Sequence, residues 1–123
     1  PSIMASDYTV YIQCAAEPVR AAIANGLGIA FPGALDRVEQ FGVPITFQAA
    51  HAMEDDLGIP FSEYPVCVEF RRSAAQGDAE LRELLCRTLA CLLGRHVHRA
   101  LGVATLVVQD SQEVVESFHS STS

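Results

Sequence analysis

Four short segments carry the side chains and the alternation that favour β-strands. Residues 8–14 are rich in β-branched and aromatic side chains. Residues 43–49 and 61–71 alternate apolar with polar positions, which predicts strands with one wetter face. Residues 103–109 are apolar on both faces, which predicts a central strand. We therefore expect a sheet of about four strands.

Two longer segments repeat apolar positions every three or four residues, which predicts helices. The first opens at Glu17 and Pro18, because proline fits the first turn of a helix, and ends near Gly28. The second covers residues 78–99, with Asp78 as its N-cap. The stripe that we expect it to bury is Leu81, Leu84, Leu85, Thr88, Leu89, Leu92 and His96.

Two shorter helices are also expected. Residues 29–41 place apolar side chains three apart after a Pro-Gly turn, and Asp110 and Glu113 have the spacing of a capping box. The resulting order is β-α-(α)-β-β-α-β-(α). It predicts an α/β (α+β) fold, a two-layer sandwich with helices packed on one face of the sheet, as in a split β-α-β unit.

The length of the chain predicts a single domain over residues 1–123. Residues 1–6 are expected to be loose or cloning-derived, since Met4-Ala5-Ser6 looks like a translation start, and residues 120–123 to be a flexible tail. The apolar runs fall far short of the ~20 residues that span a bilayer, and the first residues lack the features of a signal peptide. These features predict a cytoplasmic protein.

The charge of the chain is strongly negative. Fifteen acids stand against eight basic residues, all of them arginine, for a formal charge of −7. Without lysine, the chain excludes Schiff-base and pyridoxal enzymes and Walker-type phosphate loops. The negative charge argues against direct nucleic-acid binding. Eight acids and two arginines lie at or before residue 63, so residues 1–63 carry most of the negative charge. The resulting negative potential either keeps the protein soluble or attracts a cationic partner.

Cysteine and histidine provide no recognisable site for a metal or a cofactor. The four cysteines lie beside apolar neighbours, as buried free thiols do. Cys86 and Cys91 project about 140° apart on a helix, so they cannot share a metal. No serine or cysteine carries a nucleophile signature. We therefore expect no metal, no cofactor and no hydrolase.

The segment from residue 51 to residue 64 holds the strongest candidate for a binding surface. Its consecutive acids do not match a calcium loop, in which ligands alternate around a glycine. They do suit a surface that recognises Lys and Arg of another protein, with aromatic anchors beside the charges. The alternative is a solvated loop whose rings turn inward. The candidate partner-binding residues are Glu54, Asp55, Asp56, Glu63, Phe61 and Tyr64.

Small size, acidity, a well-formed core and the lack of a catalytic motif make the chain resemble, as a type, the bacterial immunity proteins. Those proteins neutralise secreted toxins such as those of contact-dependent growth inhibition. The resemblance implies a cytoplasmic inhibitor, not an enzyme, that binds a basic toxin domain such as a nuclease. An acidic inhibitor can occupy a cationic active site and associate faster through its field.

Pro1, the β-α-β order, Arg71 and Arg72 give a second resemblance, to the tautomerase superfamily. It implies a catalytic Pro1 amine acting as general base, and arginines that bind an acidic substrate. A third possibility is a homo-oligomer in which the sheet face with Thr46, Gln48 and Glu69 pairs with another copy.

Overall fold

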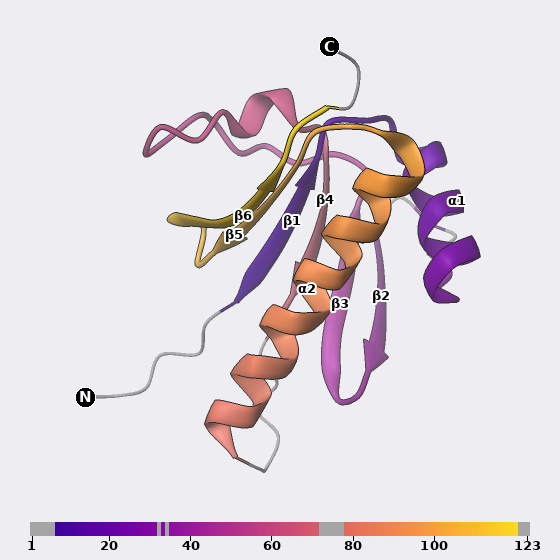
Figure 1. Ribbon diagram of the computed structural model, residues 1–123, viewed down its shortest axis with the longest axis vertical. Coiled ribbons are helices and arrows are strands. Elements are labelled where there is room, and N and C mark those ends of the chain that lie inside the picture. The colour runs from indigo at the N-terminus through magenta and orange to yellow at the C-terminus, as the bar shows by residue number, and fades with distance from the viewer. Residues whose placement is uncertain (1–6, 32, 34, 72–77, 121–123) are drawn as a thin grey trace.

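The residues that the structure describes form an antiparallel sheet of six strands, in the order β2-β3-β4-β1-β5-β6, with two α-helices (Figure 1). The computed structural model describes residues 7–31, 33, 35–71 and 78–120. The strands are β1 (Tyr8–Ile12), β2 (Leu35–Gln40), β3 (Val43–Gln48), β4 (Val66–Phe70), β5 (Thr105–Gln109) and β6 (Glu113–Phe118). The helical elements are α1 (Ala16–Leu27), a single 3-10 turn η1 (Phe61–Glu63) and α2 (Ala79–Leu101). The fold is therefore α+β, with six described strands where the sequence predicts about four.

The central strand is β1, whose residues are all buried. It pairs antiparallel with β4 and with β5, so that Val10 lies opposite both Val68 and Val107. β4 and β5 consequently run parallel to each other with β1 between them. α2 connects them across one face of the sheet, which makes β4-α2-β5 a split β-α-β unit (Figure 1).

Two of the expected helices are strands, so those two predictions are wrong. The second half of the segment 29–41 forms β2, which pairs with β3 through a turn at Phe41 and Gly42. The segment after Asp110 forms β6, which pairs with β5 through a turn at Asp110 and Ser111. Both central residues of each turn have positive φ, as in the type I′ turns that join twisted antiparallel strands. Tertiary pairing at the two sheet edges overrides the local three-residue spacing.

The buried face of α2 is only partly the one expected from the leucine pattern. Leu85 and Leu89 pack half-buried against the core, but the rest of the leucines in the stripe face outward. Leu81, Leu84 and Leu92 are 56%, 59% and 52% exposed. The sheet is instead contacted by the buried residues Cys86, Ala90, Leu93, Gly94 and Val97. Small side chains let the helix approach closely, since a Cβ added at Gly94 would lie only 3.1 Å from Val107 Cγ2.

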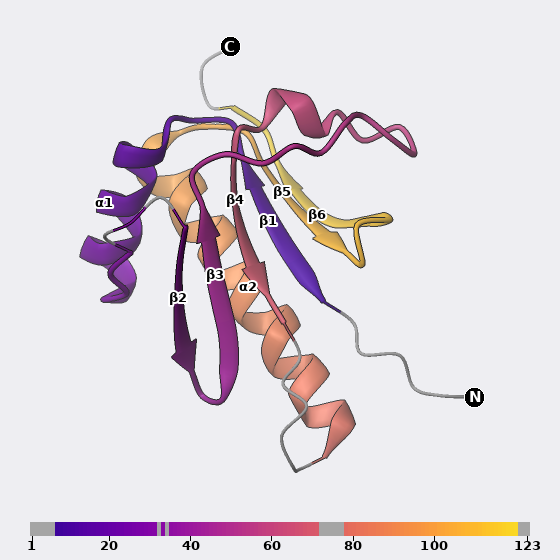
Figure 2. The same ribbon diagram turned by 180° about the vertical axis from the view of Figure 1, so that it is seen from behind.

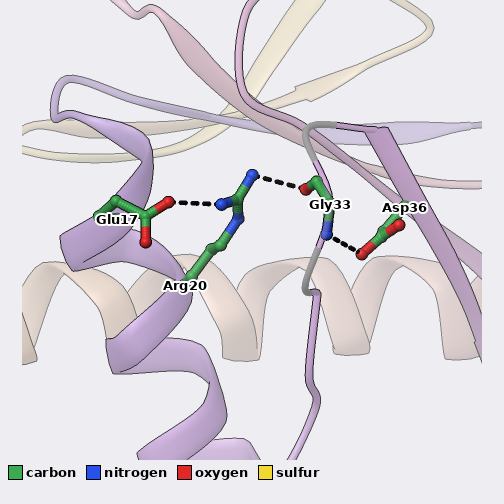
Figure 3. A network of polar contacts seen from close by, with 4 residues as sticks. All are labelled: Glu17, Arg20, Gly33 and Asp36. Atoms are coloured by element: carbon green, nitrogen blue, oxygen red, sulfur yellow. Dashed lines mark hydrogen bonds and ion pairs between the residues drawn. The ribbon is translucent and has the colours of Figure 1, made fainter.

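α1 lies in the same layer as α2, beside the β2–β3 side of the sheet (Figure 1). Its Arg20 donates to the carboxylate of Glu17 and to the backbone carbonyl of Gly33, while Gly33 N–H donates to Asp36 (Figure 3). The Arg20 guanidinium also lies 4.9 Å from the ring centroid of Phe47. This network fixes the connection from α1 to β2 and occupies Arg20.

The second face of the sheet is covered in part by the segment between β3 and β4, which we call the acidic arm (residues 50–64). Seen from behind, the arm crosses the ends of β4, β1 and β5 and then projects beyond the sheet (Figure 2). Buried side chains from the arm and the sheet form a separate apolar cluster of Tyr11, Ile59, Phe61, Tyr64, Cys67, Leu106 and Val108. The expectations for residues 1–6 and 121–123 lie outside the described residues.

Candidate partner-binding site

The base of the acidic arm is fixed by aromatic packing on β1. Phe61 and Tyr11 have ring centroids 4.9 Å apart, and Tyr11 meets the ring of His51 edge to face at 5.3 Å. Desolvation in this cluster raises the pKa of the Tyr11 hydroxyl to about 12. The base of the arm therefore packs on β1 through buried aromatic rings.

His51 joins the two ends of the arm. Its Nδ1 accepts a hydrogen bond from Met53 N–H at 3.1 Å, so the proton of the neutral ring sits on Nε2. Nε2 then donates to the carbonyl of Tyr64 at 2.5 Å. In the sequence His51 comes shortly before the acids of the arm, and in the structure its side chain links the two ends of the arm by hydrogen bonds.

The tip of the arm is a two-residue turn between Asp56 and Ile59. Asp56 N–H donates to Ile59 O at 3.2 Å, and Ile59 N–H donates to Asp56 O at 2.7 Å. Leu57 and Gly58 lie between them with φ of 53° and 76°, the pattern of a type I′ turn. Asn, Asp or Gly normally fills the first of these positions, because a branched side chain is disfavoured at positive φ. Leu57 is nevertheless there, and it is 63% exposed.

The four acids of the candidate site all lie on the surface of the arm or at its base. Asp55 Oδ1 accepts from Ser62 N–H at 2.9 Å, and the backbone and hydroxyl of Ser62 hold the pKa of the Asp55 carboxyl below its usual range. Every ion pair found in the described part of the chain lies outside the arm. The charges of Glu54, Asp55, Asp56 and Glu63 therefore face solvent, and Asp56 directly precedes the exposed Leu57.

The two aromatic residues expected as anchors are placed differently from the acids. Phe61 is fully buried and Tyr64 is 9% exposed, so both rings stabilise the arm from within, as in the alternative that the sequence left open. The exposed apolar group is Leu57, an apolar neighbour of the acids in the sequence, and not either of the two expected anchors. The signal that could have located it is the Leu57-Gly58 pair between two acids and an isoleucine, which fits a two-residue turn.

The residues of the alternative site are only partly described. Pro1 and Arg72 lie outside the described residues. Arg71 donates through Nε to Glu69 at 2.9 Å and lines a hollow of about 510 Å³ that Asp7 and Asp110 also line. Three carboxylates around one paired guanidinium do not suit an acidic substrate.

Two cysteine thiols have raised pKa values, so they form the reactive thiolate less readily. Burial, followed by the charge of Glu69, raises the pKa of the Cys67 thiol to about 12. Burial and the nearby Glu116 raise the pKa of the Cys91 thiol to about 11. Among the described residues, no group of three or more His, Cys, Asp or Glu side chains is placed to hold a metal ion.

Neither α1 nor α2, the α-helices of the described ranges, has the length and apolar content needed to cross a membrane. No protein-family model, curated protein or solved structure matches this chain.

Proposed function

We propose that this protein is a small cytoplasmic inhibitor of the immunity type, which binds a basic toxin domain, such as a nuclease, through its acidic arm. The observation that carries the proposal is the tip of the arm. There, an exposed Leu57 held at positive φ lies next to carboxylates that have no ion-pair partner among the described residues. Phe41 in the β2–β3 turn has the same φ of 53° and is 74% exposed, so the carboxylates beside Leu57 are what favour a binding role for the arm.

The residues of the arm have different roles, which follow from their contacts. The buried rings of Phe61 and Tyr64 anchor the base of the arm on the sheet, which reduces the ordering cost on binding. Leu57 enters an apolar recess of the partner, and Glu54, Asp55, Asp56 and Glu63 pair with Lys or Arg around that recess. The same carboxylates steer the encounter with a cationic surface, so association is fast at low salt and slower at high salt.

The test compares three forms of the protein as baits in a pull-down from the producing strain. In the arm variant, three acids become isosteric amides: Glu54→Gln, Asp56→Asn and Glu63→Gln. Asp55 is kept because its carboxylate holds Ser62. The control variant has the same change in net charge on exposed acids outside the arm: Glu17→Gln, Glu39→Gln and Glu113→Gln.

We expect wild type and the control variant to retain a basic polypeptide that the arm variant loses. For the purified pair, we expect the arm variant to associate at least ~10-fold more slowly at low salt. We also expect co-expression of wild type, but not of the arm variant, to protect cells from that polypeptide. The proposal is wrong if no basic polypeptide is recovered, or if the arm variant binds and protects as well as wild type.

A further inference from the structure

The outer face of α2 is an apolar stripe with no described element over it. At 100° per residue, Leu81, Leu84, Thr88 and Leu92 lie within about 80° of one another around the helix. Their mean direction is opposite that of the buried residues Cys86, Ala90, Leu93, Gly94 and Val97. The helix is thus apolar on two sides, of which one packs on the sheet and the other is more than half exposed.

A hollow lies along this stripe. It measures about 330 Å³ and is lined by Leu84, Arg87, Thr88, Cys91, Leu92 and Arg95. Thr88, the shorter side chain, separates Leu84 from Leu92, so the stripe presents two ridges with a gap between them. The outer side is apolar through Leu92 and carries the exposed Arg95 and Arg99 in the last turns. An exposed apolar patch bordered by polar groups indicates an interaction surface.

The charges of α2 are divided along its length. Asp78 caps the helix and Glu83 accepts a hydrogen bond from the Tyr8 hydroxyl at 3.4 Å, so Glu80 is the acid that the first turns offer to a partner. The basic residues Arg95 and Arg99 lie in the last two turns, which contain no acid. Arg82, the basic residue of the first turns, extends toward Gly42 of the β2–β3 turn, as shown by the 3.1 Å between its Nη1 and a Cβ built at Gly42. An identical helix laid antiparallel would therefore bring Glu80 of each copy to the basic turns of the other.

We propose that the outer face of α2 pairs with the same face of a second copy of this chain, antiparallel and about a two-fold axis at Thr88. In this register Leu84 of each copy lies opposite Leu92 of the other, and Glu80 of each lies near Arg95 of the other. The dipoles of the two helices are then antiparallel, which is the favourable arrangement. A two-fold contact is closed and self-complementary, so the assembly stops at a dimer.

The test measures mass in solution by sedimentation for wild type and three variants. Leu84→Asp and Leu92→Arg each place an unpaired charge in the stripe, so each is expected to raise the dimer dissociation constant at least ~100-fold. Position 84 of each copy lies opposite position 92 of the other, so this contact occurs twice in the dimer. The double variant Leu84→Asp/Leu92→Arg therefore creates two opposite-charge pairs and is expected to dimerise again. Leu57→Asp, at an equally exposed leucine on the arm, is the matched control and keeps the mass of wild type.

A second experiment reads the register directly. Thr88→Cys places a thiol on the two-fold axis, and mild oxidation is expected to give a covalent dimer. Arg99→Cys, on the same exposed side but far from the axis, is expected to give none. The proposal is overturned if wild type remains at 13.2 kDa up to about 1 mM protein. A dimer insensitive to Leu84→Asp, formed for example through Thr46, Gln48 and Glu69, also overturns it, as does a double variant that stays monomeric.

Discussion

Replacing Gly26 by alanine tests how α1 and α2 are held together. Gly26 is in the last turn of α1, and a Cβ built there would lie 1.9 Å from both Cε1 and Nε2 of His96 on α2. The same Nε2 donates a hydrogen bond to the carbonyl of Ala22 at 2.8 Å. The imidazole therefore occupies the space that any larger residue at position 26 needs.

Two opposing effects set the magnitude. Alanine in place of glycine in a helix is favourable by about 1 kcal/mol at most, and by less near a helix end. Displacing His96 loses the hydrogen bond to Ala22, about 0.5–1.5 kcal/mol, and forces a poorer rotamer at a similar cost. We expect Gly26→Ala to lower the free energy of unfolding by roughly 0.5–2 kcal/mol in wild type.

The sign reverses when the imidazole is absent. In a His96→Ala background, only the helix propensity remains, so Gly26→Ala should raise the free energy of unfolding by about 0.5–1 kcal/mol. The coupling between the two sites is then about 1–3 kcal/mol, measured by urea unfolding of all four forms. An equal effect of Gly26→Ala in both backgrounds would refute the contact between Gly26 and His96 as the cause.

Three further predictions concern the arm and the cluster beneath it. Leu57→Asn should raise the free energy of unfolding by about 0.5–1 kcal/mol in thermal or urea unfolding, because asparagine tolerates positive φ, while weakening partner binding. His51→Phe keeps a ring against Tyr11 but loses both hydrogen bonds, so amide exchange in the arm should become faster while β1 stays protected. Above about pH 9 the unfolded Cys67 thiol ionises before the folded one, whose pKa is about 12, so stability should fall with rising pH. Cys67→Ala should reduce the fall of the free energy of unfolding with pH, measured by urea unfolding, by about 1.4 kcal/mol per pH unit. An unchanged pH dependence would contradict the burial of the thiol.

The sequence predicts the central elements of the fold well, and the structural reason is burial. β1, β3, β4 and β5 lie between other strands and bury at least one face each, and this burial requires the alternating or continuous apolar side chains that the sequence shows. α1 and α2 carry explicit end signals: Asp78 accepts hydrogen bonds from the backbone at the start of α2, and Gly28 and Gly102 end the helices at positive φ.

The sequence does not predict the edges of the sheet or the orientation of α2. β2 and β6 are edge strands with mixed polar residues, and their turns use Phe41 and Asp110 rather than the usual Asn-Gly pair. A helical wheel finds two apolar sides on α2. The side with small residues such as Gly94 packs on the sheet, because it allows the helix to lie closer to the strands. The same limitation applies at the arm, where the sequence identifies the acids but not which apolar residue remains outside.

The two proposed surfaces lie on opposite faces of one sheet, and this placement makes them separable. α2 covers one face, whereas the base of the arm packs on the other through Phe61 and Tyr64. A dimer formed through the outer side of α2 therefore leaves both arms accessible and makes the assembly bivalent toward a partner that presents two sites. Leu84→Asp should then abolish the dimer without changing the intrinsic affinity of one arm, while Leu57→Asn should weaken the arm without changing the mass. A single variant that removed both properties would mean that the arm and α2 share one interface.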